Sequence, residues 1–347
     1  MLANSRVTPN VERRPRVLEG LHKGLPNHWY PVLRSSELGT SPISVQRFGE
    51  DLVVWRDSKG QPHVFENHCP HRGAALSLGR IRGNELACSY HGWSFNGRGD
   101  CTAMPLEAES SPRLQRISVK SYAAEDRAGY IWMFYGDLQK TAPLSIPYEL
   151  EDEHWSMFRT EYFWQTNWLN ILDNIVDPLH ALHLHVGAVT QRKRAVFKNF
   201  QITQDNQDGF RLGKVGYRED DSIGPVEGEV EFKLPNVLRL DIADGTRQGI
   251  YRVVIMPTPI DENSSCAFYA RGRSVTGLKR LWWWIAWSAY YRRPVDRVAA
   301  QDGVMMSGIG PIGDARLREH LASSDIGVIQ LRKRLNQAFF GSRDQIE

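Results

Sequence analysis

The sequence predicts an α+β protein whose two halves are built differently. Short β-type runs separated by turn residues fill the N-terminal half, whereas longer strand-like runs and amphipathic helical segments share the C-terminal half. No strand–helix–strand alternation is visible, so the sheets are expected to be antiparallel. A chain of 347 residues is also longer than a single hydrophobic core usually requires. Together these observations predict two domains.

The composition is that of an ordinary globular protein. Hydrophobic residues make up 41% and charged residues 24% of the chain, which excludes a disordered, collagenous or coiled-coil protein. The 43 basic and 40 acidic residues give a net charge of +3, too balanced to indicate a nucleic-acid surface. The four cysteines are too few for a disulfide framework and suit a reducing compartment or a metal site. Because the N-terminus lacks the apolar run of a signal peptide, a cytoplasmic location is expected.

The elements of the N-terminal half follow a polar tail at residues 1–28. Residues 29–141 are expected to form the first domain, a meander of antiparallel strands with turns rich in Gly, Asn and Asp. The expected strands are Ile43–Phe48, Leu52–Trp55, His63–Glu66, Glu85–Cys88 and Ile131–Tyr135. Ala142–Pro147 contains two prolines and predicts a linker. The second domain is therefore expected to span residues 142–347.

The second domain mixes helices and strands. Apolar residues recur at roughly helical spacing from Asn167 to about His183, although Pro178 interrupts the pattern. The expected strands are Phe210–Tyr217, Gly228–Leu234, Val237–Ile242, Gly249–Met256 and Ser265–Gly272. Three further helices are predicted, from about Leu278, over Pro294–Met306 and over Asp325–Phe340. The order of these elements favours an antiparallel sheet with helices packed on it.

The longest apolar stretch is Leu281–Tyr291, which lies between two pairs of basic residues, Lys279-Arg280 and Arg292-Arg293. A bilayer span takes about 20 residues, so no transmembrane segment is predicted. The stretch predicts a buried helix or the wall of a large pocket. Because tryptophans between basic flanks also suit a membrane surface, an interfacial helix is the alternative.

Two loops in the first domain each combine a cysteine and a histidine. Cys69-Pro-His71 and Cys88-Ser-Tyr-His91 each follow a strand-like run, and each is closely followed by glycine. Glycine allows the backbone to turn sharply behind a ligand. Two such loops facing one another can bind one tetrahedral zinc ion, or a [2Fe–2S] cluster with both cysteines on one iron and both histidines on the other.

This pair of motifs resembles the Rieske [2Fe–2S] signature of the ring-hydroxylating, non-haem iron oxygenases. Respiratory Rieske proteins have an additional cysteine in each loop, where this chain has Ala74 and Tyr90, and hydroxyl groups near the cluster, where it has Trp93 and Phe95. Fewer hydrogen bonds to the cluster sulfurs lower its reduction potential. The resemblance thus implies a cluster, bound by Cys69, His71, Cys88 and His91, that donates electrons to a centre reacting with O₂.

A second group of polar residues lies in the interrupted helix. Three histidines and two aspartates occur between Asp173 and His185. Asp177 and His180 are neighbours on a helical face, whereas His180 and His185 are rotated by about 140° and can share a metal only if the helix bends or ends. From the residues alone, His183 could replace His185 as a ligand, Asp177 could serve as a helix N-cap, and the histidines could be unrelated.

The same segment resembles the iron-binding motif of the Rieske oxygenases, an Asn followed by D-x2-H-x4-H. Here the motif is Asn174, Asp177, His180 and His185. The resemblance implies that the two histidines bind a mononuclear Fe(II), and that Asp177 links His180 to the cluster ligand His91 of a neighbouring subunit. The family takes its third ligand from a late helix. Asp302 matches in position, and the alternatives are Asp296 and Asp314.

The resemblance implies an N-terminal all-β Rieske domain and a C-terminal helix-grip, START-like domain, assembled as a homotrimer. It also implies a terminal oxygenase that uses O₂ as co-substrate to hydroxylate or demethylate a small hydrophobic substrate of aromatic, heterocyclic or steroid-like type. Gly308-Ile-Gly310-Pro-Ile-Gly313 spells a nucleotide-binding motif, but no strand precedes it. Electrons from NAD(P)H are therefore expected through a separate reductase or ferredoxin. The alternatives are an electron-transfer protein without oxygenase activity and a structural zinc module.

Overall fold

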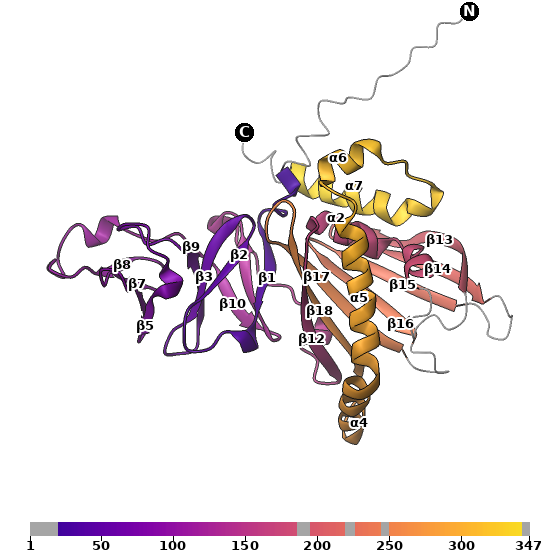
Figure 1. The fold of residues 1–347 in the computed structure, drawn as a ribbon, viewed down its shortest axis with the longest axis horizontal. Coiled ribbons are helices and arrows are strands. Elements are labelled where there is room, and N and C mark those ends of the chain that lie inside the picture. The colour runs from indigo at the N-terminus through magenta and orange to yellow at the C-terminus, as the bar shows by residue number, and fades with distance from the viewer. Residues whose placement is uncertain (1–19, 186–194, 219–225, 244–249, 342–347) are drawn as a thin grey trace, which may run out of the picture.

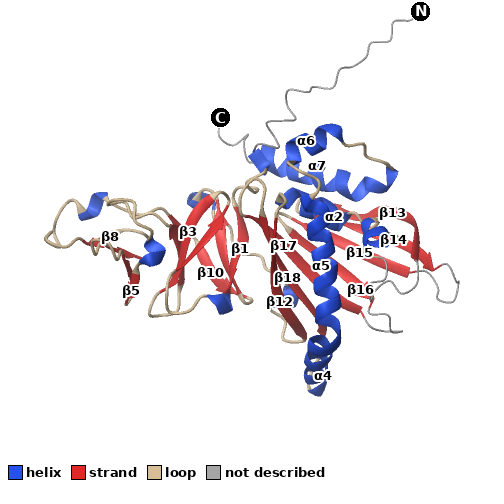
Figure 2. Ribbon diagram, viewed as in Figure 1, coloured by secondary structure: helices blue, strands red, loops and turns tan. Residues whose placement is uncertain are grey.

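The computed structural model describes residues 20–185, 195–218, 226–243 and 250–341. Figure 1 shows an elongated molecule in which an all-β N-terminal part lies beside a large sheet covered by helices. Figure 2 shows that nearly all the helical structure belongs to the second part. The predicted α+β class, with its all-β N-terminal half, is confirmed.

Three antiparallel sheets form the N-terminal part. The first has the order β1 (His28–Arg34), β11 (Tyr130–Tyr135), β10 (Ala124–Arg127). The second has the order β2 (Ile43–Arg47), β3 (Glu50–Arg56), β4 (Pro62–Glu66), β9 (Ser121–Tyr122), and the third β5 (Arg80–Arg82), β6 (Glu85–Ala87), β7 (Ser94–Asn96), β8 (Cys101–Ala103). The five predicted strands correspond to β2, β3, β4, β6 and β11. The strands β5, β7, β8 and β9, which were not predicted, have only two or three residues each and produce no detectable alternation.

One antiparallel sheet of seven strands forms the base of the C-terminal part. Its order is β12 (Trp155–Trp164), β18 (Ser265–Ser274), β17 (Ile250–Pro259), β16 (Val237–Ala243), β15 (Val226–Lys233), β14 (Gly209–Arg218), β13 (Ala195–Asn206). Every neighbouring pair is antiparallel, as the element order predicted. The two edge strands, β12 and β13, were not predicted. Most of β12 is only half-buried, so its sequence lacks the alternation of a strand with one buried face.

The helices pack on one face of this sheet (Figure 2). They are α2 (Trp168–Val176), α3 (His180–Leu184), α4 (Leu278–Ala286), the π-helix η7 (Trp287–Tyr291), α5 (Arg292–Ser307), α6 (Ile312–Arg318) and α7 (Ile326–Gly341). Alternate residues of β17, such as Tyr251, Val253 and Ile255, face the helices and join the main core. None of the helices in the described residues is long and apolar enough to cross a membrane.

The opposite face of the sheet packs against the N-terminal part. Val254 and Met256 of β17 and Phe268 of β18 share a buried cluster with Tyr130 and Trp132 of β11. This continuous apolar contact explains why the two parts lie side by side in Figure 1.

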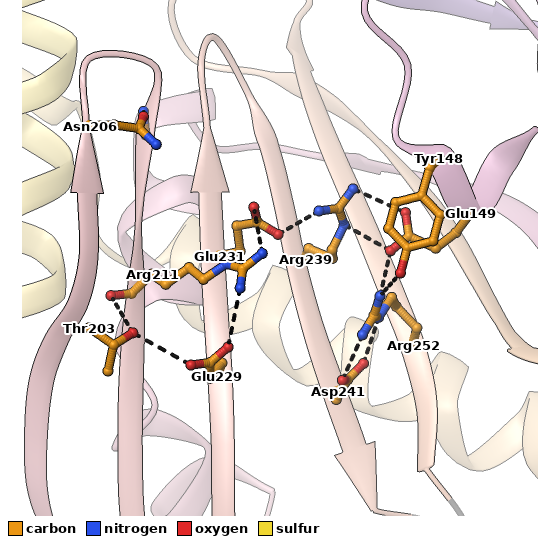
Figure 3. A network of polar contacts seen from close by, with 11 residues as sticks. Tyr148, Glu149, Thr203, Asn206, Arg211, Glu229, Glu231, Arg239, Asp241 and Arg252 are labelled. Atoms are coloured by element: carbon orange, nitrogen blue, oxygen red, sulfur yellow. Dashed lines mark hydrogen bonds and ion pairs between the residues drawn. The ribbon is translucent and has the colours of Figure 1, made fainter.

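The chain between the two parts is held by a buried charge network. Residues 141–147, which include the segment predicted as a linker, have no regular structure. They lead to a 3₁₀ turn (Tyr148–Leu150) in which the Glu149 side chain is fully buried. Its carboxylate accepts hydrogen bonds from Arg239 at 3.1 Å and from Arg252 at 2.7 Å. Figure 3 shows both guanidinium groups reaching from neighbouring strands towards this carboxylate.

Replacing the buried carboxylate should destabilise the fold. We expect Glu149→Gln to lower the free energy of unfolding by roughly 3 kcal/mol, since it removes the fully buried carboxylate that Arg239 and Arg252 share. Denaturant unfolding followed by tryptophan fluorescence measures the change. Glu229→Gln is the control in the same network, because that side chain is 53% exposed and 3.9 Å from Arg211; its effect should stay below about 1 kcal/mol. Equal effects of the two substitutions would contradict the interpretation.

Candidate functional site

Two loops of the N-terminal part carry the predicted cysteine and histidine ligands, and their backbones follow the same path. In each loop the cysteine N–H donates to the carbonyl five residues further on, at 2.9 Å for Cys69 and 2.8 Å for Cys88. The carbonyl of the same cysteine accepts from Gly73 or Gly92, whose φ angles are +78° and +76°. Other residues rarely adopt this conformation, so the glycines fix the shape of both loops.

The four predicted ligands form two pairs. Cys69 and Cys88 are both buried, and their thiols lie close enough to influence one another's ionisation. The rings of His71 and His91 lie 4.5 Å apart, and His71 stacks on Trp93. Burial raises the pKa of the Cys69 thiol, and the nearby Cys88 adds to this rise. Two adjacent thiolates therefore require a cation to be stable here.

The spacing of the four side chains fits a two-iron cluster better than one zinc ion. Two ligand atoms on a single zinc ion lie at most about 4.6 Å apart, since Zn–S bonds are about 2.3 Å long. Among the described residues, three ligand atoms that all lie within 4.8 Å of one another occur at one place, and the four loop side chains do not form it. The loop side chains therefore do not meet at one point. A pair of thiols beside a pair of imidazoles is the donor set of a Rieske cluster.

That other place is formed by His180, His185 and Asp302. Nε2 of His180 lies 3.6 Å and Nε2 of His185 lies 3.2 Å from Oδ1 of Asp302. The side chains of His185 and Asp302 are each 6% exposed, and Oδ1 of Asp302 has no aligned hydrogen-bond donor. A buried carboxylate oxygen without a donor, facing two imidazole nitrogens, suits a shared metal ion.

The break in the helix at Pro178 brings the two histidines together. Asn167 caps the start of α2 by accepting the N–H of Leu169 at 3.0 Å. The helix ends at Val176, because Pro178 disfavours the helical conformation in Asp177, whose backbone is extended. A new helix, α3, starts at His180 and ends at Leu184, so His185 lies just beyond it. The two imidazole rings are thereby 5.4 Å apart.

Hydrogen bonds fix the orientation of both rings. Nδ1 of His180 contacts the main-chain carbonyl of Asp177, and Nδ1 of His185 lies 3.1 Å from Oε1 of Gln301. Because both partners are acceptors, each Nδ1 carries the proton, and each Nε2 presents its lone pair towards Asp302. No motif in the sequence indicated a role for Gln301. Its position next to Asp302 was the one signal of this contact.

The surroundings shift the pKa values of the two histidines in opposite directions. Burial lowers the pKa of His180, although Asp302 and the Asp177 carbonyl partly offset this effect. Burial acts the same way on His185, but the Asp302 carboxylate and Gln301 outweigh it, so the pKa of His185 is raised. Burial also raises the pKa of Asp177, whose carboxylate accepts the Leu179 N–H at 2.9 Å.

The remaining candidates lie elsewhere. Asp296 contacts Tyr162 and is 3.7 Å from Arg271, Asp314 is exposed in the first turn of α6, and His183 is exposed in α3. None of the three joins the group formed by His180, His185 and Asp302. The structure therefore brings together Asp302, rather than either rival aspartate, with the two histidines.

Two contacts that the sequence did not reveal hold the helices in place. A Cβ atom on Gly303 would lie 2.6 Å from Nε1 of Trp164, so this glycine allows α5 to pack closely on β12 beside Asp302. Asp173 in α2 accepts hydrogen bonds from Arg316 at 3.0 Å and from Arg332 at 2.6 Å. The aspartate thereby ties α2 to α6 and α7.

Comparison with known proteins places this geometry in a family. Residues 28–123 match the family model of the Rieske [2Fe-2S] domain, and residues 164–339 match that of the vanillate O-demethylase oxygenase C-terminal domain. The phthalate 4,5-dioxygenase oxygenase subunit of Pseudomonas putida is 31% identical, over 88% of this chain and 79% of that protein. The chain belongs to the Rieske non-haem iron oxygenases. This membership confirms the expected [2Fe–2S] cluster and mononuclear iron.

Other Rieske oxygenases resemble the chain over different lengths. The oxygenase in the reduced oxygenase–ferredoxin complex of carbazole 1,9a-dioxygenase superposes with a TM-score of 0.77 at 19% identity, over 93% of this chain and 94% of that one. The 4β-methylsterol monooxygenase of Methylococcus capsulatus is 35% identical over 51% of this chain and 49% of that protein. The chain spans less than half the length of several curated relatives that it matches.

Proposed function

We propose that the protein is the terminal oxygenase of a Rieske system. In this proposal Cys69, His71, Cys88 and His91 hold the cluster, and His180, His185 and Asp302 hold the iron. The observation that carries it is the convergence of two tautomer-fixed imidazoles on a buried carboxylate. When bound, the cluster supplies single electrons and the iron activates O₂ for insertion of oxygen into an organic substrate.

The protein residues prepare this site. His180, His185 and Asp302 would hold the iron through two imidazoles and one carboxylate, the donor set of non-haem irons that react with O₂. The acceptors at each Nδ1 keep the Nε2 atoms available as ligands. Burial of His185 and Asp302 limits access of water to the ligand atoms.

The shape of the chain favours electron transfer between subunits. In Figure 1 the sheet of β5 to β8 lies at one end of the molecule, whereas α2 and α5 lie in the other half. Cluster and iron within one chain are therefore well separated. A head-to-tail homotrimer would place the loops of one subunit against Asp177 of the next, and we propose that Asp177 links His180 to His91 of the partner subunit there.

Partners and substrate follow from the same proposal. A ferredoxin or reductase would deliver electrons that originate from NAD(P)H, and the carbazole dioxygenase complex shows a ferredoxin bound to a related oxygenase. Relatives named dioxygenase and monooxygenase both occur. The proposed substrate is a small hydrophobic compound of aromatic, heterocyclic or steroid-like type, which the protein hydroxylates or demethylates. We propose a cytoplasmic location, because four cysteines, two of them proposed cluster ligands, suit a reducing compartment.

Iron content tests the proposal directly. We expect about three irons per wild-type chain, two in the cluster and one at the second site. Asp302→Asn should lose the single iron, because a neutral amide is a poor replacement for the anionic ligand, while the visible absorption of the cluster stays unchanged. Asp296→Asn is the matched control on the same helix and should keep all three irons. A wild-type chain with two irons would indicate an electron-transfer protein instead.

The role of Asp177 is tested by separating metal binding from turnover. Asp177→Ala should reduce turnover by roughly 10- to 100-fold, the usual range for a residue that orients a metal ligand. Iron content and the cluster spectrum should remain, because Asp177 is not one of the three converging ligands. Asp314→Ala serves as the control on an exposed helix. If Asp177→Ala turned over substrate at the wild-type rate, the bridging role would be wrong.

Gln301 is proposed as a positioning residue for His185. Gln301→Leu removes the acceptor at Nδ1 and should weaken Fe(II) binding by roughly 10-fold or more. The measurement is a titration of the metal-free second site with Fe(II), which does not depend on activity. Gln301→Glu keeps an acceptor and should restore most of the affinity. Equal affinity of the Leu variant and the wild type would show that the contact has no orienting effect.

A further inference from the structure

Helix α4 and the π-helix η7 expose large apolar side chains on their outer surface. Trp282 is 70% exposed, Trp284 57% and Tyr290 74%. Leu278, Leu281 and Ile285 are also exposed, and their spacing places them with Trp282 on one side of the helix. Figure 1 shows α4 projecting beyond the strands of the sheet at the lower edge of the molecule. We call the surface formed by Leu278, Leu281, Trp282 and Ile285 the tryptophan face; Trp284 and Tyr290 flank it.

The inner side of the same helices is firmly attached to the sheet. Trp283 and Trp287 are buried, and Trp287 stacks on Phe158 with ring centroids 4.9 Å apart. Nε1 of Trp283 donates to the carbonyl of Ser156 at 3.1 Å. The sequence favoured a buried helix, but the structure buries only this side. The tryptophan face is therefore presented rigidly to its surroundings.

Basic residues frame the tryptophan face at both ends. Lys279 and Arg280 are exposed at the start of α4, and Arg292 and Arg293 are exposed where α5 begins. Arg280 donates to the carbonyl of Glu153, and Arg292 lies 3.8 Å from Asp296. Exposed apolar side chains between cations complement a surface that is apolar inside and anionic outside.

We propose that the tryptophan face docks on the surface of an anionic lipid bilayer. Tryptophan and tyrosine prefer the boundary between lipid headgroups and acyl chains, and lysine and arginine are attracted to anionic headgroups. The helix would lie in this boundary without crossing it, consistent with the absence of a spanning helix in the described residues. A two-fold contact with a second copy is disfavoured, because antiparallel pairing of the helices would bring their basic ends together.

Vesicle co-sedimentation tests the docking. The full wild-type chain should pellet with vesicles made of equal parts phosphatidylglycerol and phosphatidylcholine, less with phosphatidylcholine alone, and less at high salt. The double variant Leu281→Ala/Trp282→Ala should lower the partition coefficient at least tenfold. Lys279→Gln and Arg293→Gln should each lower it about fivefold, the effect expected for the loss of one basic residue near an anionic surface.

Matched controls separate docking from unfolding. Phe163→Ala removes an aromatic side chain that is 61% exposed at the other end of β12, and it should leave vesicle binding unchanged. The iron content of all variants should match the wild type, because none of these residues contacts the iron site. The proposal is overturned if the wild type does not pellet with anionic vesicles. It is also overturned if the double variant binds equally well, or if it changes only the oligomeric state measured by sedimentation velocity.

Discussion

The buried carboxylate of Asp302, facing the imidazoles of His180 and His185, is the interaction on which the C-terminal half depends. Its two partners come from a broken helix and it comes from α5, more than a hundred residues later in the chain. Helix α5 reaches this position because Gly303 permits close packing on Trp164. Without that approach, the carboxylate and the histidines could not share a metal ion.

The charge of Asp302 explains why this arrangement requires a cation. A carboxylate oxygen that is buried without an aligned donor is costly by itself. The neighbouring histidines cannot compensate fully, because burial favours the neutral form of His180. A divalent metal ion resolves both problems, since it neutralises the carboxylate and requires neutral imidazoles. The same reasoning applies to the adjacent buried thiols of Cys69 and Cys88.

The packing of the two parts determines where the two sites lie relative to one another and to the tryptophan face. The shared apolar cluster and the ion pairs of Glu149 fix the N-terminal part against the sheet. The sheet of β5 to β8 therefore lies at one end of the molecule, away from α2 and α5 (Figure 1). On the other side, α5 continues directly from the π-helix and α4. The helices that form the tryptophan face thus continue into the helix that carries Asp302. If this face binds a bilayer, the arrangement suits an apolar substrate.

The sequence by itself determined the α+β class, the antiparallel sheets and both ligand motifs, because these depend on local periodicity and on spacing within short segments. Pro178 even indicated the helix break that brings His180 and His185 together. Only the tertiary structure showed that Asp302, and neither Asp296 nor Asp314, lies beside the two histidines, since this depends on how α5 packs. It alone revealed Gln301 as the acceptor for His185 and the exposure of Trp282, because both follow from contacts between distant segments that no local pattern records.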